Sequence, residues 1–208
     1  MKPVESLLSY VVPYADGVPK FVARQALIKA AQQFCMQTLV WQEDYPEVIV
    51  HPGKFIEAPV PPYANVLKYM QVFYDGKELA SVSRDSLGAS GVDYRALEGQ
   101  PRYYYQASLN TIRLVPEPEE HGVVRMTVAL VPSLEAKELP DDLIQRFWPA
   151  LVNGALADIK QTQGQSYSDP QAAVVYLQLF AQGVREAKNE AARSFGRGAG
   201  RVAYQRII

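Results

Sequence analysis

Residues 19–41 read PKFVARQALIKAAQQFCMQTLVW and carry the clearest amphipathic helix pattern in the chain. Small and apolar residues recur at i, i+3, i+4 and i+7, and polar residues fill the opposite side. The expected buried face consists of Ala23, Leu27, Ala30, Ala31, Phe34 and Thr38, opposite Arg24, Gln25, Lys29, Gln32, Gln33 and Gln37. Because the alanines permit close approach, we expect another helix to pack here around Phe34. We expect the first helix to end around Glu43 to Tyr45, since Pro46 disfavours helical backbone at the preceding residue.

Two partner helices are predicted more than a hundred residues downstream. One starts at Pro140-Asp141-Asp142, where acidic residues suit the first turn, and Pro149 within it predicts a kink or an early break. The other starts at the cap Ser168-Asp169-Pro170 and runs to about Phe195, with Gly196 ending it. The face of the former consists of Leu143, Ile144, Phe147, Leu151, Gly154, Ala155 and Ala157 or Asp158. The face of the latter consists of Ala173, Tyr176, Leu177, Phe180, Val184 and Ala187.

Between these helices the hydrophobic pattern alternates with a period of two. The strongest hairpin signal joins Asn65 to Tyr74 with Lys77 to Ala80 through the turn Asp75-Gly76. Further strands are predicted at Val48 to Val50, Phe55 to Ala58, Tyr103 to Ala107, Thr111 to Val115 and Val123 to Val131, and a helical turn or loop at Ser83 to Gly91. The last strand is expected to point Val124, Met126, Val128 and Leu130 inward, with Arg125 and Thr127 outward. About six strands joined by short turns indicate a small antiparallel sandwich or barrel.

The predicted fold class is therefore α+β, with a discontinuous bundle of three long helices, an inserted antiparallel β sandwich or barrel and an extended C-terminal tail. Residues 1–46 and 139–196 are expected to form the bundle, 47–138 the β-rich insert and 197–208 the tail. Eight of the 13 tyrosines and ten of the 15 prolines lie between residues 45 and 140. Such an aromatic surface with rigid connections is common where proteins meet proteins.

The composition is that of a globular protein, with 48% hydrophobic and 21% charged residues in 208. A net charge of -1 gives no overall electrostatic case for binding nucleic acid or an acidic membrane. No apolar run reaches the roughly 18 residues of a membrane span, and the N-terminus lacks a signal-peptide pattern. The single cysteine, Cys35, excludes an internal disulfide and fits a reducing cytosol. We expect a soluble protein, intracellular when made.

The sequence offers no cluster of reactive side chains. His51 and His121 each lie in a turn without a nearby cysteine or second histidine, which favours ordinary surface residues over metal ligands. Cys35 adjoins Phe34 near the predicted buried face, so a core thiol is favoured over a nucleophile. The glycines at positions 196, 198 and 200 follow a helix rather than a strand, which argues against a phosphate-binding loop. We expect no enzymatic activity, no cofactor and no metal.

Two further patterns are open to a functional interpretation but favour a structural one. The acidic pairs Asp141-Asp142 and Glu119-Glu120 fit helix capping and a solvated turn better than general acid and base catalysis. Tyr103-Tyr104-Tyr105 could stack on nucleic acid bases, but only Arg102 and Arg113 lie nearby. A strand that packs or pairs through its tyrosines is therefore favoured.

The C-terminal segment 193–208 holds four arginines, no acidic residue and several apolar residues. A disordered terminus remains one interpretation. A tail that folds onto a partner has this composition, and we favour it. The candidate docking residues are Arg197, Arg201, Val202, Tyr204, Arg206, Ile207 and Ile208.

With these pieces in order, the sequence resembles the head-to-tail adaptor proteins (connector or head-completion proteins) of tailed bacteriophages, particularly short-tailed ones. The resemblance covers most of the chain. It rests on Leu7-Leu8, Val12-Pro13-Tyr14, residues 25–35 with Thr38 and Trp41, Tyr74-Asp75-Gly76, Gly99-Gln100-Pro101, Tyr103-Tyr104, Ile112, Leu114-Val115-Pro116, residues 128–133, residues 153–157, Ser168-Asp169-Pro170, Phe180, Gly183 and Ala187.

This resemblance implies a structural virion protein at the head-to-tail junction, made in the host cytoplasm. It implies a homo-oligomeric ring, usually of twelve copies, under the portal protein and above a tail or nozzle protein. DNA would leave through the channel of the ring without specific binding, and no membrane is involved. The alternative is a nucleic-acid-binding or packaging-associated protein that uses the arginine-rich tail, which a steep salt dependence of DNA affinity would distinguish. A cell-wall-degrading tail enzyme would need a carboxylate pair or a zinc site, and the sequence offers no convincing one.

Overall fold

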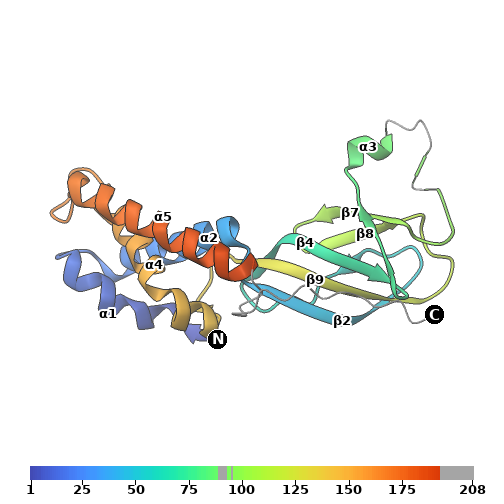
Figure 1. Ribbon diagram of the computed structural model, residues 1–208, viewed down its shortest axis with the longest axis horizontal. Coiled ribbons are helices and arrows are strands. Elements are labelled where there is room, and N and C mark those ends of the chain that lie inside the picture. Colours follow the sequence, from blue (N-terminus) through green and yellow to red (C-terminus); the bar gives the residue numbers. More distant parts are fainter. Residues whose placement is uncertain (89–92, 95, 193–208) are drawn as a thin grey trace.

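The computed structural model describes residues 1–88, 93–94 and 96–192. Three long helices, α2 (Lys20–Thr38), α4 (Asp141–Lys160) and α5 (Pro170–Ala192), pack together, and the strands extend from one end of this bundle (Figure 1). The predicted α+β class, with a helical bundle interrupted by antiparallel sheets, is confirmed. The predicted tail at 197–208 lies outside the described residues.

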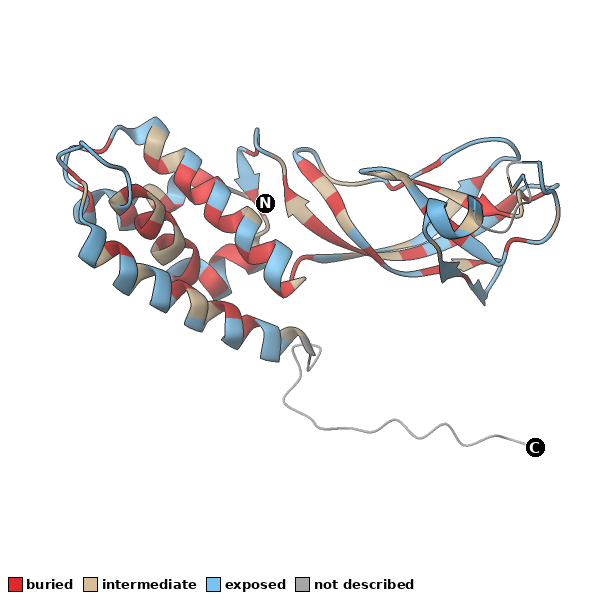
Figure 2. Cartoon of the chain, turned by 90° about the horizontal axis from the view of Figure 1, so that it is seen from above, coloured by how far each residue is buried: buried red, intermediate tan, exposed pale blue. Residues whose placement is uncertain are grey.

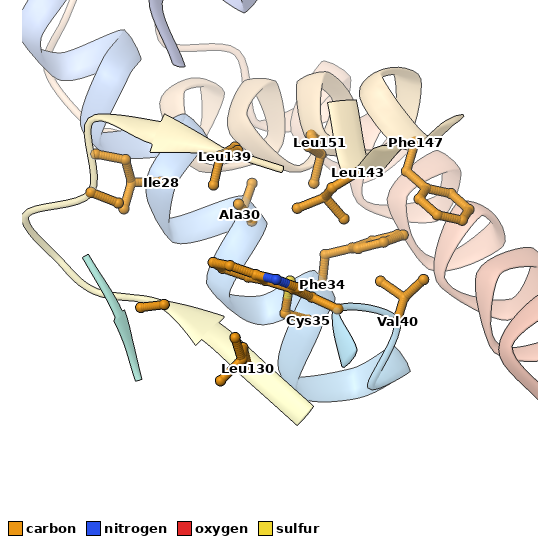
Figure 3. Close-up of a cluster of buried hydrophobic side chains, with 14 of the residues drawn as sticks. Ile28, Ala30, Phe34, Cys35, Val40, Leu130, Leu139, Leu143, Phe147 and Leu151 are labelled. Atoms are coloured by element: carbon orange, nitrogen blue, oxygen red, sulfur yellow. The ribbon is translucent and has the colours of Figure 1, made fainter. Parts of the chain in front are cut away.

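The bundle is held together by buried aromatic rings and by close approach of small residues. Phe34 is fully buried and lies near Phe147 (Figure 3). Its ring centroid is 5.2 Å from that of Phe147 and 6.3 Å from that of Phe180. A Cβ atom added at Gly154 would lie 3.0 Å from the Cβ of Ala30, so α2 and α4 touch where the alanine face predicted a contact. All six residues of the predicted face of α2 are buried.

The first helix ends earlier than predicted. It ends at Thr38 because Leu39 adopts left-handed backbone (φ 53°) and donates its amide to the carbonyl of Cys35 at 2.9 Å. Strand β2 (Gln42–Val50) then begins ahead of Pro46, which lies at a register shift between Tyr45 and Val48. Since β2 is an edge strand, proline's missing N–H costs little there.

Two expectations for the other helices also change. Helix α4 does not break at Pro149, because the residue four positions earlier, Gln145, is exposed and water can satisfy its carbonyl. Leu177, expected on the buried face of α5, is 49% exposed, whereas Phe180 and Val184 on the same predicted face are buried. Asp169 caps α5 as predicted, because its Oδ1 accepts the amide of Ala172 at 3.0 Å.

The N-terminal segment lies along the bundle. It comprises β1 (Lys2–Pro3), η1 (Val4–Leu7), α1 (Leu8–Val11) and η2 (Val12–Tyr14). Strand β1 pairs with β10 (Glu138–Leu139), and the amino group of Met1 lies 3.4 Å from Oδ1 of Asp141. The start of the chain is therefore fixed at the point where α4 begins.

The β region consists of two four-stranded sheets. One has the order β2, β9 (Gly122–Pro132), β4 (Ala64–Tyr74) and β5 (Lys77–Glu78). The other has the order β3 (Ile56–Glu57), β8 (Thr111–Val115), β7 (Tyr103–Ser108) and β6 (Ala80–Ser81), with α3 (Arg84–Gly88) following β6. All pairs in these sheets are antiparallel except β6 with β7. The predicted hairpin through Asp75-Gly76 is confirmed as β4–β5, and the strands predicted at 103–107 and 111–115 pair with each other as β7 and β8.

The two sheets are joined by side chains that cross between them. The rings of Tyr69 on β4 and Tyr104 on β7 lie 6.1 Å apart, and Oδ1 of Asn110 accepts the amide of Val66 at 2.8 Å. On β9 the predicted inward residues Val124, Met126, Val128 and Leu130 are fully buried.

One buried cluster runs from the bundle into the β region. Its members include Phe34 and Cys35 on α2 and Leu130 on β9 (Figure 3). The amide of Leu130 donates to the carbonyl of Trp41 at 2.8 Å, and buried residues continue across the junction (Figure 2). The helices and sheets therefore share a core where they meet.

Candidate functional site

A reactive cluster of side chains is absent from the described part of the chain. Within 1–88, 93–94 and 96–192, no three histidine, cysteine or acidic side chains gather in a way that could hold a metal ion. Over the same residues, no helix is long and apolar enough to cross a membrane. Cys35 is fully buried, and burial raises the pKa of its thiol from 9.0 to about 12, as expected of a core cysteine. The features that invite a functional explanation are surfaces.

The docking residues predicted from the sequence belong to the C-terminal tail. Arg197, Arg201, Val202, Tyr204, Arg206, Ile207 and Ile208 all lie outside the described residues. The last described helix residue is Ala192, at the C-terminal end of α5. The docking role of the tail therefore remains a prediction.

An aromatic surface that sequence reasoning missed lies where η2 and α1 meet α4. It consists of Tyr10, Tyr14 and Trp148, all exposed, and Tyr14 is 60% exposed. The rings of Tyr10 and Trp148 stack with centroids 4.6 Å apart. A groove of about 330 Å³ opens beside them, lined by Tyr10, Tyr14, Trp148, Pro149, Val152, Asn153, Leu156 and Tyr176. The sequence contained one signal for this surface, because Trp148 follows Phe147 and therefore lies off the predicted buried face of α4.

A second apolar surface lies on α5. Val174 and Leu177 are one helical turn apart and are 55% and 49% exposed. Successive residues of a helix point about 100° apart, so Leu177 points to a different flank of α5 from its neighbour Tyr176, which lines the aromatic groove. We call Val174 and Leu177 the aliphatic surface, and it is separate from the aromatic surface.

A third feature is an acidic groove between α4 and the C-terminal half of α5. Its volume is about 250 Å³, and its lining includes Leu179, Glu186 and Glu190 from α5 and Arg146 and Phe147 from α4, so it carries two carboxylates and one cation. It combines carboxylates with apolar contact area. Glu190 is two residues from Ala192, the last described residue, so this groove lies near the described end of α5.

The tyrosine run packs within the β region, as predicted. Tyr104 and Tyr105 are buried, and the hydroxyl of Tyr104 donates to the carbonyl of Tyr69 at 3.4 Å. Burial is also the main cause that raises the pKa of Tyr104 and Tyr69. Of the three residues only Tyr103 is exposed, so the run does not offer a platform for stacking successive bases.

The two histidines are brought together, which corrects the expectation of isolated histidines. The Nδ1 atoms of His51 and His121 are 2.9 Å apart, and the rings meet edge to face. His51 directly follows β2 and His121 directly precedes β9, where Val50 is paired with Gly122. The contact depends on strand register, so no local sequence pattern could have revealed it.

Comparison with known proteins adds the family. A family model described as SU10 adaptor protein matches residues 8–203, whereas no curated protein matches the chain. Because the match spans nearly the whole sequence, the chain belongs to the SU10 adaptor family and is a phage adaptor protein. The match confirms the predicted resemblance to phage adaptor proteins. Because the family is structural rather than catalytic, it also confirms the prediction that the chain is not an enzyme. An adaptor interacts with other virion proteins, so the exposed surfaces described above are candidate contacts.

Proposed function

We propose that this phage adaptor assembles as a ring of twelve copies at the head-to-tail junction of the virion. In this proposal the ring sits under the portal protein, joins it to a tail or nozzle protein, and surrounds the channel through which DNA leaves. The family membership supports the structural role, and the ring is our extension of it.

The observation that carries the ring is the presence of two separate apolar surfaces on one bundle. A closed ring needs a heterologous contact, in which one surface of each copy meets a different surface of the next. The aromatic surface offers rigid rings and a groove, and the aliphatic surface offers Val174 and Leu177 as projecting side chains. Such aromatic residues are enriched at protein interfaces. We therefore pair the aromatic surface of one copy with the aliphatic surface of its neighbour.

The charge of the chain suits a channel that lets DNA pass. A net charge of -1 over 208 residues provides no excess of cations to neutralise phosphates. Binding of DNA should accordingly be weak even at low salt. A steep fall of DNA affinity with salt would instead support the nucleic-acid-binding alternative that uses the tail arginines.

The ring is tested by breaking each surface separately. Trp148→Glu and Leu177→Glu should each prevent ring formation, whereas Leu109→Glu, at an exposed residue in the β7–β8 turn, should not. Each variant is measured by mass photometry and electron microscopy, alone and with the portal protein of the same virus. Rings from either surface variant would contradict the proposed contact.

Mixing the two surface variants gives a sharper result. The Trp148→Glu protein keeps an intact aliphatic surface, and the Leu177→Glu protein keeps an intact aromatic surface. One productive contact therefore remains possible between them, so the mixture should form pairs that cannot grow into rings. If each variant instead dimerises alone and the mixture adds nothing, the contact is not heterologous.

We also propose that tail residues 197–208 dock on the neighbouring copy during assembly. The acidic groove supports this choice, since its two carboxylates, Glu186 and Glu190, outnumber its one cation, Arg146, and so complement the arginines of the tail, and its apolar residues offer contact area. Deleting 197–208 should leave thermal unfolding of the bundle nearly unchanged and abolish assembly. Glu186→Lys with Glu190→Lys should reproduce that defect. If the deletion blocks assembly but the groove variant does not, the tail docks on the portal protein instead, and undiminished assembly after the deletion would remove the tail from the proposal.

A further inference from the structure

We propose that His51 and His121 together form a binding site for a divalent transition-metal ion, with Cu²⁺ and Ni²⁺ preferred over Zn²⁺. The site lies where β2 ends and β9 begins, at the end of the first sheet away from the helical bundle (Figure 1). Neutral imidazole nitrogen is a common ligand for these ions. The site has no part in the proposed ring contact, which involves only the bundle.

The two nitrogens lie close enough together to bind one ion. The Nδ1 atoms are 2.9 Å apart because one ring donates a hydrogen bond to the other. Two nitrogens about 2.0–2.1 Å from one ion are about 2.9 Å apart when the angle at the metal is 90° and about 3.4 Å apart in a tetrahedron, so small movements of the rings reach either geometry. The choice of metal rests on ligand chemistry, since Cu²⁺ and Ni²⁺ take nitrogen ligands in square-planar or tetragonal sites and Cu²⁺ heads the affinity order of the divalent ions.

The strands hold the two histidines opposite each other before any ion binds. Val50 pairs with Gly122, so the next residue on each strand continues the same register. The amide of Lys54 donates to the carbonyl of His51 at 3.3 Å, and the amide of Val123 donates to Oδ1 of Asp75 at 2.9 Å. Both imidazole rings are exposed, so an ion and its remaining water ligands can reach them.

Binding requires a change of tautomer and a rotation of the rings that turns both Nδ1 lone pairs toward the ion. In the metal-free contact between neutral rings, the Nδ1–H group of one ring donates a hydrogen bond to Nδ1 of the other. When the ion binds, that proton moves through water to Nε2 of the same ring, and both Nδ1 lone pairs then coordinate the metal. Glu119 and Glu120 precede His121 and add negative charge, which the cation of Lys54 partly opposes.

The test uses tag-free protein, since His51 and His121 are the only histidines in the sequence. Calorimetric titration should give one saturable site for Cu²⁺ and for Ni²⁺, weaker binding of Zn²⁺, and none of Mg²⁺. The spin-resonance spectrum of bound Cu²⁺ should show coupling to two imidazole nitrogens. His51→Gln and His121→Gln should each lower Cu²⁺ affinity by about tenfold or more, because each breaks the chelate.

Two controls separate this site from other sources of metal affinity. The double variant His51→Gln with His121→Gln gives the affinity of the N-terminal amine and carboxylates alone. Glu120→Gln should change Cu²⁺ affinity far less than either histidine substitution. The proposed site would be overturned if wild type bound Cu²⁺ no more tightly than the double variant, or if the spectrum showed no coupling to two imidazole nitrogens. The proposed preference for Cu²⁺ would be overturned if Zn²⁺ bound more tightly.

Discussion

The helical bundle and the β region solve the same packing problem in different ways. In the bundle, α2, α4 and α5 meet through rings and through glycines that let helices touch, as at Gly154 and Ala30. In the β region, three long strands form one sheet, and a sheet of shorter strands packs on it through buried residues such as Ile112 and through the hydrogen bond that Asn110 accepts from Val66. Apolar packing therefore holds both regions, but the two sheets add a partly buried polar contact that the helix contacts do not need.

This difference also separates two kinds of surface. The bundle exposes aromatic and aliphatic side chains on different flanks, which suits contact with other protein subunits. The end of the first sheet instead carries histidines and carboxylates. Substitutions in each region should accordingly fail in different ways.

Phe34→Ala should lower the free energy of unfolding by about 3–5 kcal/mol, because it empties the space between the rings of Phe147 and Phe180. Urea unfolding followed by circular dichroism measures the change. Phe21→Ala, which truncates a 66% exposed ring on the same helix, is the matched control and should cost far less. Equal losses for the two variants would mean that the bundle does not depend on this aromatic cluster.

Asn110→Ala should cost about 1–3 kcal/mol, since it leaves the amide of Val66 without its side-chain acceptor between the two sheets. Hydrogen exchange should show faster exchange at Val66 while α4 stays protected. Asn110→Asp keeps an acceptor oxygen and should retain more of the protection at Val66. Uniform loss of protection in α4 as well would show that the second sheet and the bundle unfold as one unit.

Gly183→Ala should destabilise the bundle by about 1 kcal/mol net. The added Cβ would lie 2.6 Å from the Cβ of Ala150, which forces α4 and α5 apart, and alanine's higher helix propensity offsets part of the cost. Gly88→Ala has open space around the added atom and should leave stability almost unchanged. A stabilised Gly183→Ala protein, measured by thermal unfolding, would show that the helices separate more easily than volume packing implies.

Ionisation of the Cys35 thiol should leave the free energy of unfolding unchanged at neutral pH and lower it under alkaline conditions. Burial raises the pKa of its thiol from 9.0 to about 12, so the folded protein keeps a proton that the unfolded chain loses. The contribution is therefore complete below pH 9 and falls by up to about 1.4 kcal/mol per pH unit as the pH rises toward 12. Urea unfolding at pH 8 and pH 10 should show a larger loss for wild type than for Cys35→Ala, and parallel losses would place the thiol in contact with water.

The sequence predicted the bundle better than the β region because helical periodicity is local. The spacing of residues alone predicts the buried face of α2 from Ala23 to Thr38. The small side chains on that face predict close approach of another helix, which Gly154 on α4 makes. The end of α2 was missed, since left-handed backbone at Leu39, rather than Pro46, stops the helix. Strand positions were mostly found, but which strands share a sheet depends on long-range pairing.

The candidate surfaces were harder to predict for the same reason. Tyr10 and Trp148 are far apart in the chain and form a surface only once α1 lies against α4. His51 and His121 are 70 residues apart and meet only because β2 and β9 are paired in one register. Their types and turn positions were visible in the sequence, but their contact was not.

The pairing of β2 with β9 also has a mechanical consequence. The chain leaves the bundle along β2 and returns along β9, and these neighbouring strands are both continuous with the shared core through Trp41 and Leu130. At about 3.4 Å per residue, the 11 residues of β9 span roughly 35 Å. Together with β4 they act as a stiff lever, and its fixed end is the buried cluster that the bundle and the β region share. A sideways push on the histidine end is therefore delivered to the helices as torque, while a pull along the strands loads their hydrogen bonds in shear.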